Sequence, residues 1–337
     1  MAMLTVENMF TAAEMTDAVN KLPTMPMRLA GLFEEKSVRT TTVPLDIKQG
    51  TIVLVADSPR GSMPASLRGQ SSSRTMKTFT VPHLAQADVV RPEDIQDTRA
   101  FGTDQPEVAE SVVAERMLEL KNNLEMTKEF HRLGAVKGVV YDADGSTELH
   151  NIFSSFGVTK KALTITFPKA EAQDNPIMSK LLEAKRHVSQ KMGGTPVQRM
   201  EAVIGGNAYD KLTGHKLVRQ YFEDWLSRKQ DFGDNDFRSR GFTYGGITFY
   251  EASEVVGGQT LVNTDKGHLY PVGQGIFKTW FAPADWMETA NTYGLPFYAR
   301  MDALEKGRGF DIEVQANPLC LCTYPEALVE LTFTAQS

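Results

Sequence analysis

The chain of 337 residues has no long run of apolar residues. None approaches the roughly 20 residues that a membrane-spanning helix needs. The first ten residues, MAMLTVENMF, also lack the basic and apolar regions of a signal peptide. These absences predict a cytoplasmic product. The 41% hydrophobic and 23% charged fractions are ordinary for a globular protein of two or three lobes, so disorder is not expected.

Patterns of catalytic and metal-binding residues are also missing. The two cysteines, Cys320 and Cys322, would share one face of a strand, where they are poorly placed for a disulfide, so we expect buried free thiols. No histidine stands three to five residues from another histidine or a cysteine, as compact metal sites usually require. Surface or capping roles are expected for all six: His83, His131, His150, His187, His215 and His268. The sequence therefore predicts no catalytic residue, no metal and no cofactor.

Basic residues are fewer than acidic ones, and the formal net charge of −6 argues against a dedicated nucleic-acid binder. One segment departs from this balance. From Ser58 to Thr80 all four charges are basic, and they are Arg60, Arg68, Arg74 and Lys77. The segment is rich in Gly, Ser and Pro and lies between strand-like runs, which predicts a long basic hairpin arm. A mobile solvated loop is the alternative interpretation.

One long helix is predicted from Asp104 to Gly134. Asp104 can cap its first N–H groups, Pro106 suits the first turn, and Gly134 suits a left-handed stop. Its apolar residues recur at helical spacing and form one stripe: Val113, Met117, Leu120, Leu124, Met126, Phe130 and Leu133. Such a helix would be roughly 40 Å long, so we expect it to cross a sheet or to bridge lobes.

Shorter elements are predicted on both sides of this helix. Thr11 and Glu14 have capping-box spacing and open a short helix, which we interpret as an arm outside the core. Asp144-Gly145 between alternating runs predicts a two-residue hairpin turn. Pro176, preceded by Asp174, begins a further helix that ends at Gly193, and a second lobe is expected to start near it.

The turn in VIGGNAYDK follows a predicted strand and opens a predicted helix. A phosphate cradle needs that setting, so nucleotide binding at Gly205 and Gly206 is an alternative function. However, a phosphate-binding loop of the Walker type needs Lys and then Ser or Thr after its last glycine, whereas Asn207 and Ala208 follow here. The pattern therefore favours a structural turn.

The segment from Pro283 to Leu331, PADWMETANTYGLPFYARMDALEKGRGFDIEVQANPLCLCTYPEALVEL, strongly resembles the C-terminal part of the tailed-phage major capsid proteins typified by phage lambda. The stretch VIGGNAYDKLTGHKLVRQYFEDW resembles the central part of that family, and VRPEDIQDTRAFG resembles its first half. The resemblance implies an α+β fold of the Hong Kong 97 capsid type. It also implies a viral structural protein, not an enzyme, that assembles into pentamers and hexamers as an icosahedral head around packaged double-stranded DNA.

The same resemblance suggests how the chain is divided. We expect an N-terminal arm, strands of a peripheral domain, an extended loop, the rest of the peripheral domain with spine helix 105–133, an approximate axial domain, and C-terminal strands returning to the core. The corresponding ranges are 1–36, 37–56, 57–78, 79–170, 171–270 and 271–337.

The opposite net charges of the long helix and the extended loop predict a contact between neighbouring subunits. The long helix carries seven acids against four bases, a net of −3, while the extended loop carries +4. Because the family lays its loop across a neighbouring subunit, we expect the basic loop to contact acids of that helix on an adjacent copy. The predicted contact residues are Arg60, Arg68, Arg74, Lys77, Glu107, Glu110, Glu115 and Glu119.

Further partners are expected, among them a portal. The chain begins with its own arm and shows no long charged coiled coil ahead of it, so we expect a separate scaffold protein and no cleaved pro-segment. Because the chain is acidic overall, we expect DNA to be held by confinement rather than by base contacts. The loop from Asp57 to Met76 contains no lysine, so a lysine–asparagine cross-link between subunits is not expected. A small decoration protein is expected instead. Assembly is expected in the host cytoplasm, with the chain ending in the virion capsid.

Overall fold

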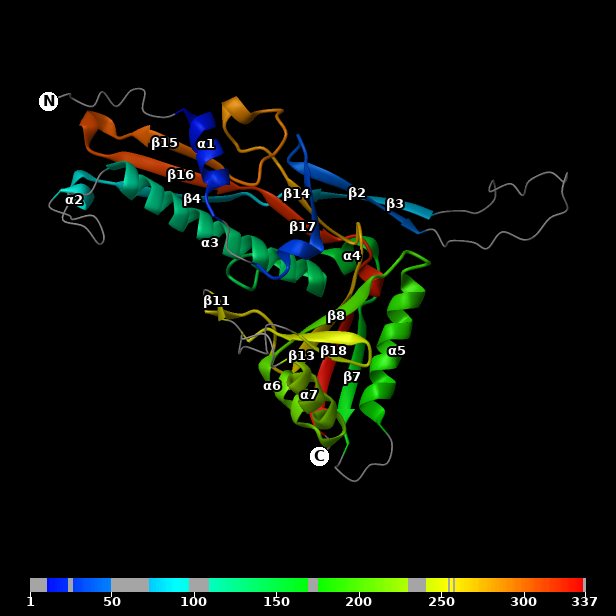
Figure 1. Cartoon of the computed structure of the whole chain (residues 1–337). Coiled ribbons are helices and arrows are strands. Elements are labelled where there is room, and N and C mark those ends of the chain that lie inside the picture. Colours follow the sequence, from blue (N-terminus) through cyan, green and yellow to red (C-terminus); the bar gives the residue numbers. More distant parts are fainter. Residues whose placement is uncertain are drawn as a thin grey trace, which may run out of the picture. The chain divides into compact units, whose positions relative to one another are not determined.

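The computed structural model describes residues 11–23, 27–49, 73–96, 109–168, 175–229, 241–253, 255–256 and 258–335. These residues form helices together with mixed and antiparallel sheets (Figure 1). They divide into two compact units. Unit 1 draws on Met1–Val43, Phe79–Arg132 and Lys278–Cys320, and unit 2 on Pro44–Thr78, Leu133–Phe277 and Leu321–Ser337.

The first helix, α1 (Ala12–Lys21), begins with the capping box that the sequence predicts. The Glu14 N–H donates to Thr11 Oγ1 at 3.2 Å, and the Thr11 N–H donates to Glu14 Oε2 at 2.8 Å. Met15 and Val19 are buried in the core of unit 1, and Thr16 Oγ1 donates to the Ala299 carbonyl. The interpretation of this helix as an arm outside the core is therefore wrong. Its apolar stripe is buried against strands that lie almost 300 residues away in sequence.

The long helix α3 spans Ala109–Lys137. Its predicted N-terminal cap, Asp104, lies outside the described residues. The predicted stop at Gly134 is wrong, because the helix continues to Lys137 and the left-handed residue is Gly138, at φ 82°. Gly134 serves packing instead. A Cβ at Gly134 would lie 2.8 Å from the Val140 Cα, so only glycine allows this approach.

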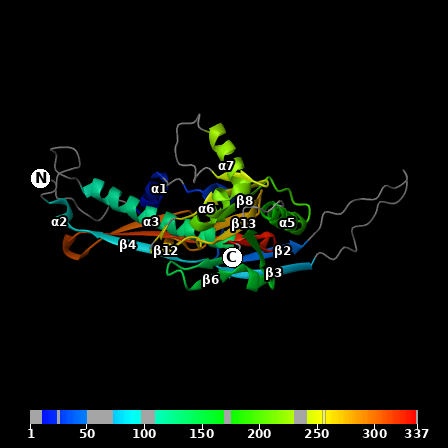
Figure 2. The ribbon, with the colours of Figure 1, turned by 90° about the horizontal axis from the view of Figure 1, so that it is seen from below.

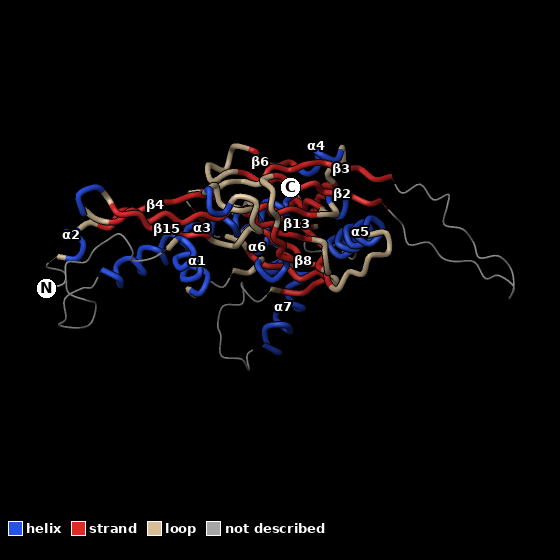
Figure 3. Tube along the Cα trace, turned by 90° about the horizontal axis from the view of Figure 1, so that it is seen from above, coloured by secondary structure: helices blue, strands red, loops and turns tan. Residues whose placement is uncertain are grey.

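In unit 1, α3 and α1 pack against a three-stranded sheet. The predicted stripe is confirmed at Val113, Met117, Leu120 and Leu124, which are buried in one cluster with Ile312 and other sheet residues. The sheet has the order β15-β16-β4, and both pairs are antiparallel. Its strands are β4 (Leu84–Val90), β15 (Tyr298–Ala303) and β16 (Phe310–Ala316). Figures 2 and 3 both show α3 running along β4.

Two further sheets contain residues of unit 1. A second sheet has the order β1-β14-β17 and contains β1 (Phe33–Ser37), β14 (Phe277–Phe281) and β17 (Pro318–Cys322). The strands β2 (Thr42–Gln49) and β3 (Ser73–Thr80) pair with each other. These two strands stand where the sequence places the base of the predicted hairpin arm. Short helical segments of unit 1 are α2 (Pro92–Ile95), η2 (Ala30–Leu32) and η5 (Glu305–Gly307).

Unit 2 is built on a six-stranded sheet of order β7-β18-β13-β8-β10-β9. Its strands are β7 (Lys161–Phe167), β8 (Arg199–Ile204), β9 (Phe242–Tyr244), β10 (Ile247–Glu251), β13 (Lys266–Val272) and β18 (Val329–Ala335). The register pairs Leu163 with Leu331, Leu331 with Gly267, and Gly267 with Ile204. One face is therefore apolar. The alternate residues, among them Glu330, His268 and Glu201, form a second, polar face.

Three helices of unit 2 pack on strands of this sheet. They are α5 (Pro176–Lys191), which packs on β7, α6 (Gly206–Gly214), which packs on β10, and α7 (Lys216–Lys229), which packs on β9. The start of α5 at Pro176 is confirmed, and its cap is Asn175, whose side chain accepts from the Met178 N–H at 3.0 Å. The predicted order of strand, glycine turn and helix is confirmed in β8 and α6, and α7 follows them.

The hairpin predicted around Asp144-Gly145 exists, but its turn is longer than two residues. It joins β5 (Val139–Tyr141) to β6 (Glu148–Asn151). Asp144 accepts hydrogen bonds from both the N–H and the hydroxyl groups of Ser146 and Thr147, and these bonds lower the pKa of its carboxyl. The Asp144 side chain therefore stabilises a loop that is longer than a two-residue turn. The remaining elements are α4 (Ile152–Phe156), β11 (Val255–Val256), β12 (Gln259–Thr260), η4 (Met287–Thr289) and η6 (Pro325–Ala327).

Candidate assembly surfaces

The predicted contact residues fall into three groups. Glu110, Glu115 and Glu119 are exposed on α3, and Lys77 is exposed on β3. Arg74 lies in β3, but its side chain is outside the described residues, as are Arg60, Arg68 and Glu107 altogether.

The helix surface is more acidic than its sequence count suggests. Lys121, Lys128 and Arg132 are buried, as is Glu125, so they do not offset the exposed acids. Arg116 lies among those acids, with its Nη1 3.5 Å from Glu119 Oε2 and its Nε 3.5 Å from Asp88 Oδ2.

A shallow hollow of about 460 Å³ lies beside these acids. Four acids and two arginines from β4, α2, α3 and β16 line it: Asp88, Glu93, Asp94, Asp311, Arg91 and Arg116. Because these residues come from separate parts of the sequence, the chain's charge pattern alone did not reveal them. The hollow extends the acidic surface of α3 onto the neighbouring strands.

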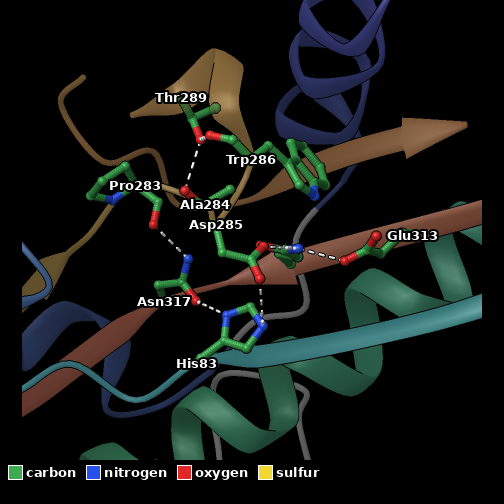
Figure 4. A network of polar contacts seen from close by, with 9 residues as sticks. His83, Pro283, Ala284, Asp285, Trp286, Thr289, Glu313 and Asn317 are labelled. Atoms are coloured by element: carbon green, nitrogen blue, oxygen red, sulfur yellow. Dashed lines mark hydrogen bonds and ion pairs between the residues drawn. The ribbon is translucent and has the colours of Figure 1, made fainter. Parts of the chain in front are cut away.

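A loop of unit 1, residues 284–296, presents apolar side chains to solvent. Met287 is 93% exposed, Tyr293 59% and Leu295 41%. Figure 4 shows how the first half of this loop is held. Gln315 Nε2 donates to Asp285 Oδ1 at 2.7 Å, and Thr289 Oγ1 donates to the Ala284 carbonyl at 2.8 Å.

The same network continues to the segment before β4. His83 Nδ1 lies 2.9 Å from Asn317 Oδ1, and His83 Nε2 lies 3.8 Å from Asp285 Oδ2 (Figure 4). Asn317 Nδ2 donates in turn to the Pro283 carbonyl at 2.9 Å. A chain of polar contacts therefore fixes the base of the apolar loop to its own unit.

The inward face of α3 carries cations over aromatic rings. Lys128 Nζ lies 4.6 Å from the centre of the Phe297 ring, and burial followed by the nearby Arg132 lowers the pKa of this lysine. Arg132 Nη2 lies 3.0 Å from Glu35 Oε1, and Nη1 lies 3.5 Å from Glu129 Oε2. Lys121 Nζ donates to the Leu22 carbonyl at 2.7 Å. These contacts fasten the N-terminal segment to the helix through buried charges.

The polar face of the unit 2 sheet contains a buried titratable cluster. His268 is buried, and its burial, followed by the charges of Lys137 and Lys160, lowers the pKa of its ring to about 3. Beside it, burial opposes ionisation of Glu330, but hydrogen bonds from Lys160 and Lys266 lower the pKa of that carboxyl to about 2. Burial, followed by Lys160, lowers the pKa of Lys137 to about 8. The cluster has one carboxylate among three lysines.

The glycine turn before α6 is explained by packing. A Cβ at Gly205 would lie 2.3 Å from the Asn263 carbonyl oxygen, so the turn is pressed against that segment. The Ala208 N–H donates to the Thr264 carbonyl at 2.8 Å, so this donor of the helix N-terminus is already used within the chain. The arrangement gives nucleotide binding no support.

Histidines and cysteines show no catalytic arrangement among the described residues. His131 and His268 are buried in the fold, so the expected surface or capping role is wrong for these two. Cys320 and Cys322 are buried free thiols, as predicted. In the part of the chain that the structure describes, no cluster of histidine, cysteine and acid is arranged to hold a metal ion. Nor is any helix in that part long and apolar enough to cross a membrane.

Comparison with known proteins decides the family. The model of the family "Phage major capsid protein E" matches residues 11–333, which is nearly the whole chain. The chain belongs to this family. It is a structural protein of the phage capsid and not an enzyme, which confirms the resemblance seen in the sequence and removes the nucleotide-binding alternative.

Curated relatives agree in length as well as in sequence. The major capsid protein of Salmonella phage Felix O1 is 25% identical, with 97% of this chain and 97% of the relative covered. The major capsid protein of Pseudomonas phage KPP10 is 25% identical, with 96% and 97% covered. The capsid protein thus matches both relatives over nearly their whole length.

Solved structures show the same fold at lower sequence identity. The putative capsid protein of an E. coli CFT073 prophage aligns with a TM-score of 0.55 at 12% identity, covering 96% of this chain and 99% of the other. The capsid of Ralstonia phage GP4 aligns with a TM-score of 0.54 at 9% identity, covering 90% and 88%. The predicted α+β fold of the Hong Kong 97 capsid type is confirmed.

Proposed function

We propose that this capsid protein assembles into pentamers and hexamers that close into an icosahedral head around packaged double-stranded DNA. The family match over residues 11–333 carries this proposal. The two curated relatives support it, because both bear the name major capsid protein and match along nearly their full lengths. In this proposal the peripheral domain includes the part of unit 1 that contains most of the spine helix, and the axial domain includes residues 171–270 of unit 2.

Assembly is tested on the purified chain by light scattering and negative-stain electron microscopy. We expect large particles of uniform diameter. A chain that stays monomeric with and without co-expressed scaffold protein would count against the proposal.

The basic extended loop is proposed to contact the acidic surface of a neighbouring copy. That surface includes Glu110, Glu115 and Glu119 on α3, which are exposed, and the adjoining hollow with Asp88 and Asp311. Each exposed pair would contribute only about 0.2 to 1 kcal/mol, but every subunit of a shell repeats the contact. The summed free energy of these contacts favours assembly, although each single contact between two subunits is weak.

Reversing two loop charges, as in Arg60→Glu with Arg68→Glu, should impair assembly because like charges would then face each other. The chain should stay folded by circular dichroism, while the yield of sedimenting particles falls several-fold. Lys306→Glu with Arg308→Glu is a charge-matched control at exposed sites of unit 1. Normal particles from the variant with both loop arginines reversed would contradict the loop contact.

The mature shell is proposed to be secured by buried area rather than by cross-links. The loop 57–76 offers no lysine for an isopeptide bond. Exposed ion pairs are weakened by salt, so a shell under DNA pressure needs further contact area, which a small decoration protein could supply. A separate scaffold and a portal complete the proposed partners, and DNA is held by confinement without base contacts.

Mature particles boiled in denaturant should therefore give one monomer band of this chain on a gel. A second small protein at comparable copy number should accompany it. A ladder of covalent oligomers would refute the first expectation, and stable, filled particles made of this chain alone would refute the second.

A further inference from the structure

We propose that residues 284–296, together with Arg39, form an apolar contact surface for a second copy of this chain. This inference rests on the proposed function and names a contact that the charge pattern of the sequence does not indicate. We call these residues the apolar loop surface.

The exposure of this loop is unusual. Six large apolar side chains of the described residues are exposed. Three of them, Met287, Tyr293 and Leu295, lie in one nine-residue stretch of this loop. Single exposed apolar residues are ordinary on protein surfaces, but a group of them on one short segment marks an interaction site.

The loop is rigid enough to present these side chains in fixed positions. The Gly294 N–H donates to the Val38 carbonyl at 2.9 Å, and the Leu295 N–H donates to Tyr298 Oη at 2.9 Å. The Trp286 ring meets the Tyr298 ring edge to face at 6.1 Å. With the Asp285 and Thr289 hydrogen bonds, these contacts hold both halves of the loop. A surface that is already ordered loses little conformational entropy on binding.

The loop cannot bury its apolar side chains by moving inward. A Cβ at Gly294 would lie 2.1 Å from the Phe281 carbonyl oxygen, so the backbone here is already in contact with the strand beneath. None of the described residues buries Met287 or Tyr293. A partner that packs on the loop would remove them from water.

The chemistry of the surface favours a copy of the same chain as this partner. Arg39 lies over the Tyr293 ring, with its guanidinium carbon 4.1 Å from the ring centre, while the exposed acid Glu288 follows Met287. Methionine, aromatic residues and arginine are the types enriched in protein interfaces. Because this surface carries a cation and an acid beside an apolar centre, Arg39 of one copy can face Glu288 of a second copy across a twofold axis, where a contact is self-complementary.

The contact is tested by placing a thiol on the loop in Met287→Cys. The native thiols should stay silent to maleimide, because burial raises the pKa of Cys320 to about 11 and that of Cys322 to about 12. We expect labelling at position 287 to be at least about tenfold slower in particles than in the unassembled chain, which corresponds to an opening cost of about 1.4 kcal/mol. Glu305→Cys, at an exposed position of the same unit outside this surface, is the matched control and should label at similar rates in both states.

Each outcome decides the inference. Slower labelling in particles that contain only this chain supports it. Equal rates overturn it, and so does protection that appears only when a second protein species is present. If the wild-type chain forms no particles, the proposed function fails separately. The surface is then judged by sedimentation of the unassembled chain, where Met287→Ser with Tyr293→Ser must weaken self-association, and unchanged association overturns the inference.

Discussion

Replacing Arg132 with alanine is expected to lower the free energy of unfolding of the capsid protein by about 3 kcal/mol. The side chain of Arg132 is 2% exposed and lies between Glu35 and Glu129. Its removal leaves Glu129, whose side chain is 14% exposed, without that cation in a site with little water. Glu35 is about half exposed and should recover hydration, so most of the loss comes from Glu129.

Arg116→Ala on the same helix is the matched control. Arg116 also has two acidic partners, Asp88 and Glu119, but its side chain is 41% exposed. Its loss should cost less than about 1 kcal/mol, because exposed ion pairs contribute little. Urea denaturation of the unassembled chains compares the two variants. Equal decreases in the free energy of unfolding would show that burial does not determine how much Arg132 contributes to stability.

The second large effect is a loss of stability in acid that originates at His268. Burial lowers the pKa of this ring to about 3 in the folded chain, from an ordinary value of 6.5. Below pH 6.5 the His268 ring binds a proton in the unfolded chain but stays neutral in the folded chain. Stability is therefore complete above pH 6.5 and falls as the pH drops toward 3, by at most about 1.4 kcal/mol per pH unit.

Two variants distinguish the contribution of His268 to the acid sensitivity from that of Glu330. His268→Gln cannot titrate, so the dependence of stability on pH between 6.5 and 3 should become flatter. Glu330→Gln should instead remove the loss between pH 4.5 and 2, the range in which the unfolded carboxyl is protonated and the folded one is not. Thermal unfolding of the unassembled chains across this range measures both slopes. An unchanged slope in His268→Gln would show that another group causes the acid sensitivity.

The parts of the fold that could be predicted from sequence are those set by local rules. The capping box at Thr11, the start of α5 at Pro176 and the stripe from Val113 to Leu124 each depend on residues a few positions apart. Hairpin signals succeeded for the same reason, although Asp144 organised a longer turn than its sequence suggested. Neighbouring residues carry the information in all these cases.

The parts that could not be predicted depend on residues brought together by the fold. The pairing of β4 with β16 joins segments more than 200 residues apart, and nothing local specifies that register. Lys128 and Arg132 look like solvated helix charges in the sequence, but the rings of Phe297 and Phe33 lie over them in the fold. Gly134 is of the residue type that often ends a helix, yet in the fold it allows close packing against Val140. The exposure of Met287 likewise depends on which side chains the other strands leave uncovered.

Assembly of this chain into a capsid is tested most directly by a three-dimensional reconstruction, by electron cryo-microscopy, of the particles that it forms. We expect closed icosahedral shells whose fivefold and sixfold capsomers each consist of copies of this fold. Particles without such symmetry, or shells whose repeating density does not fit units 1 and 2, would contradict it.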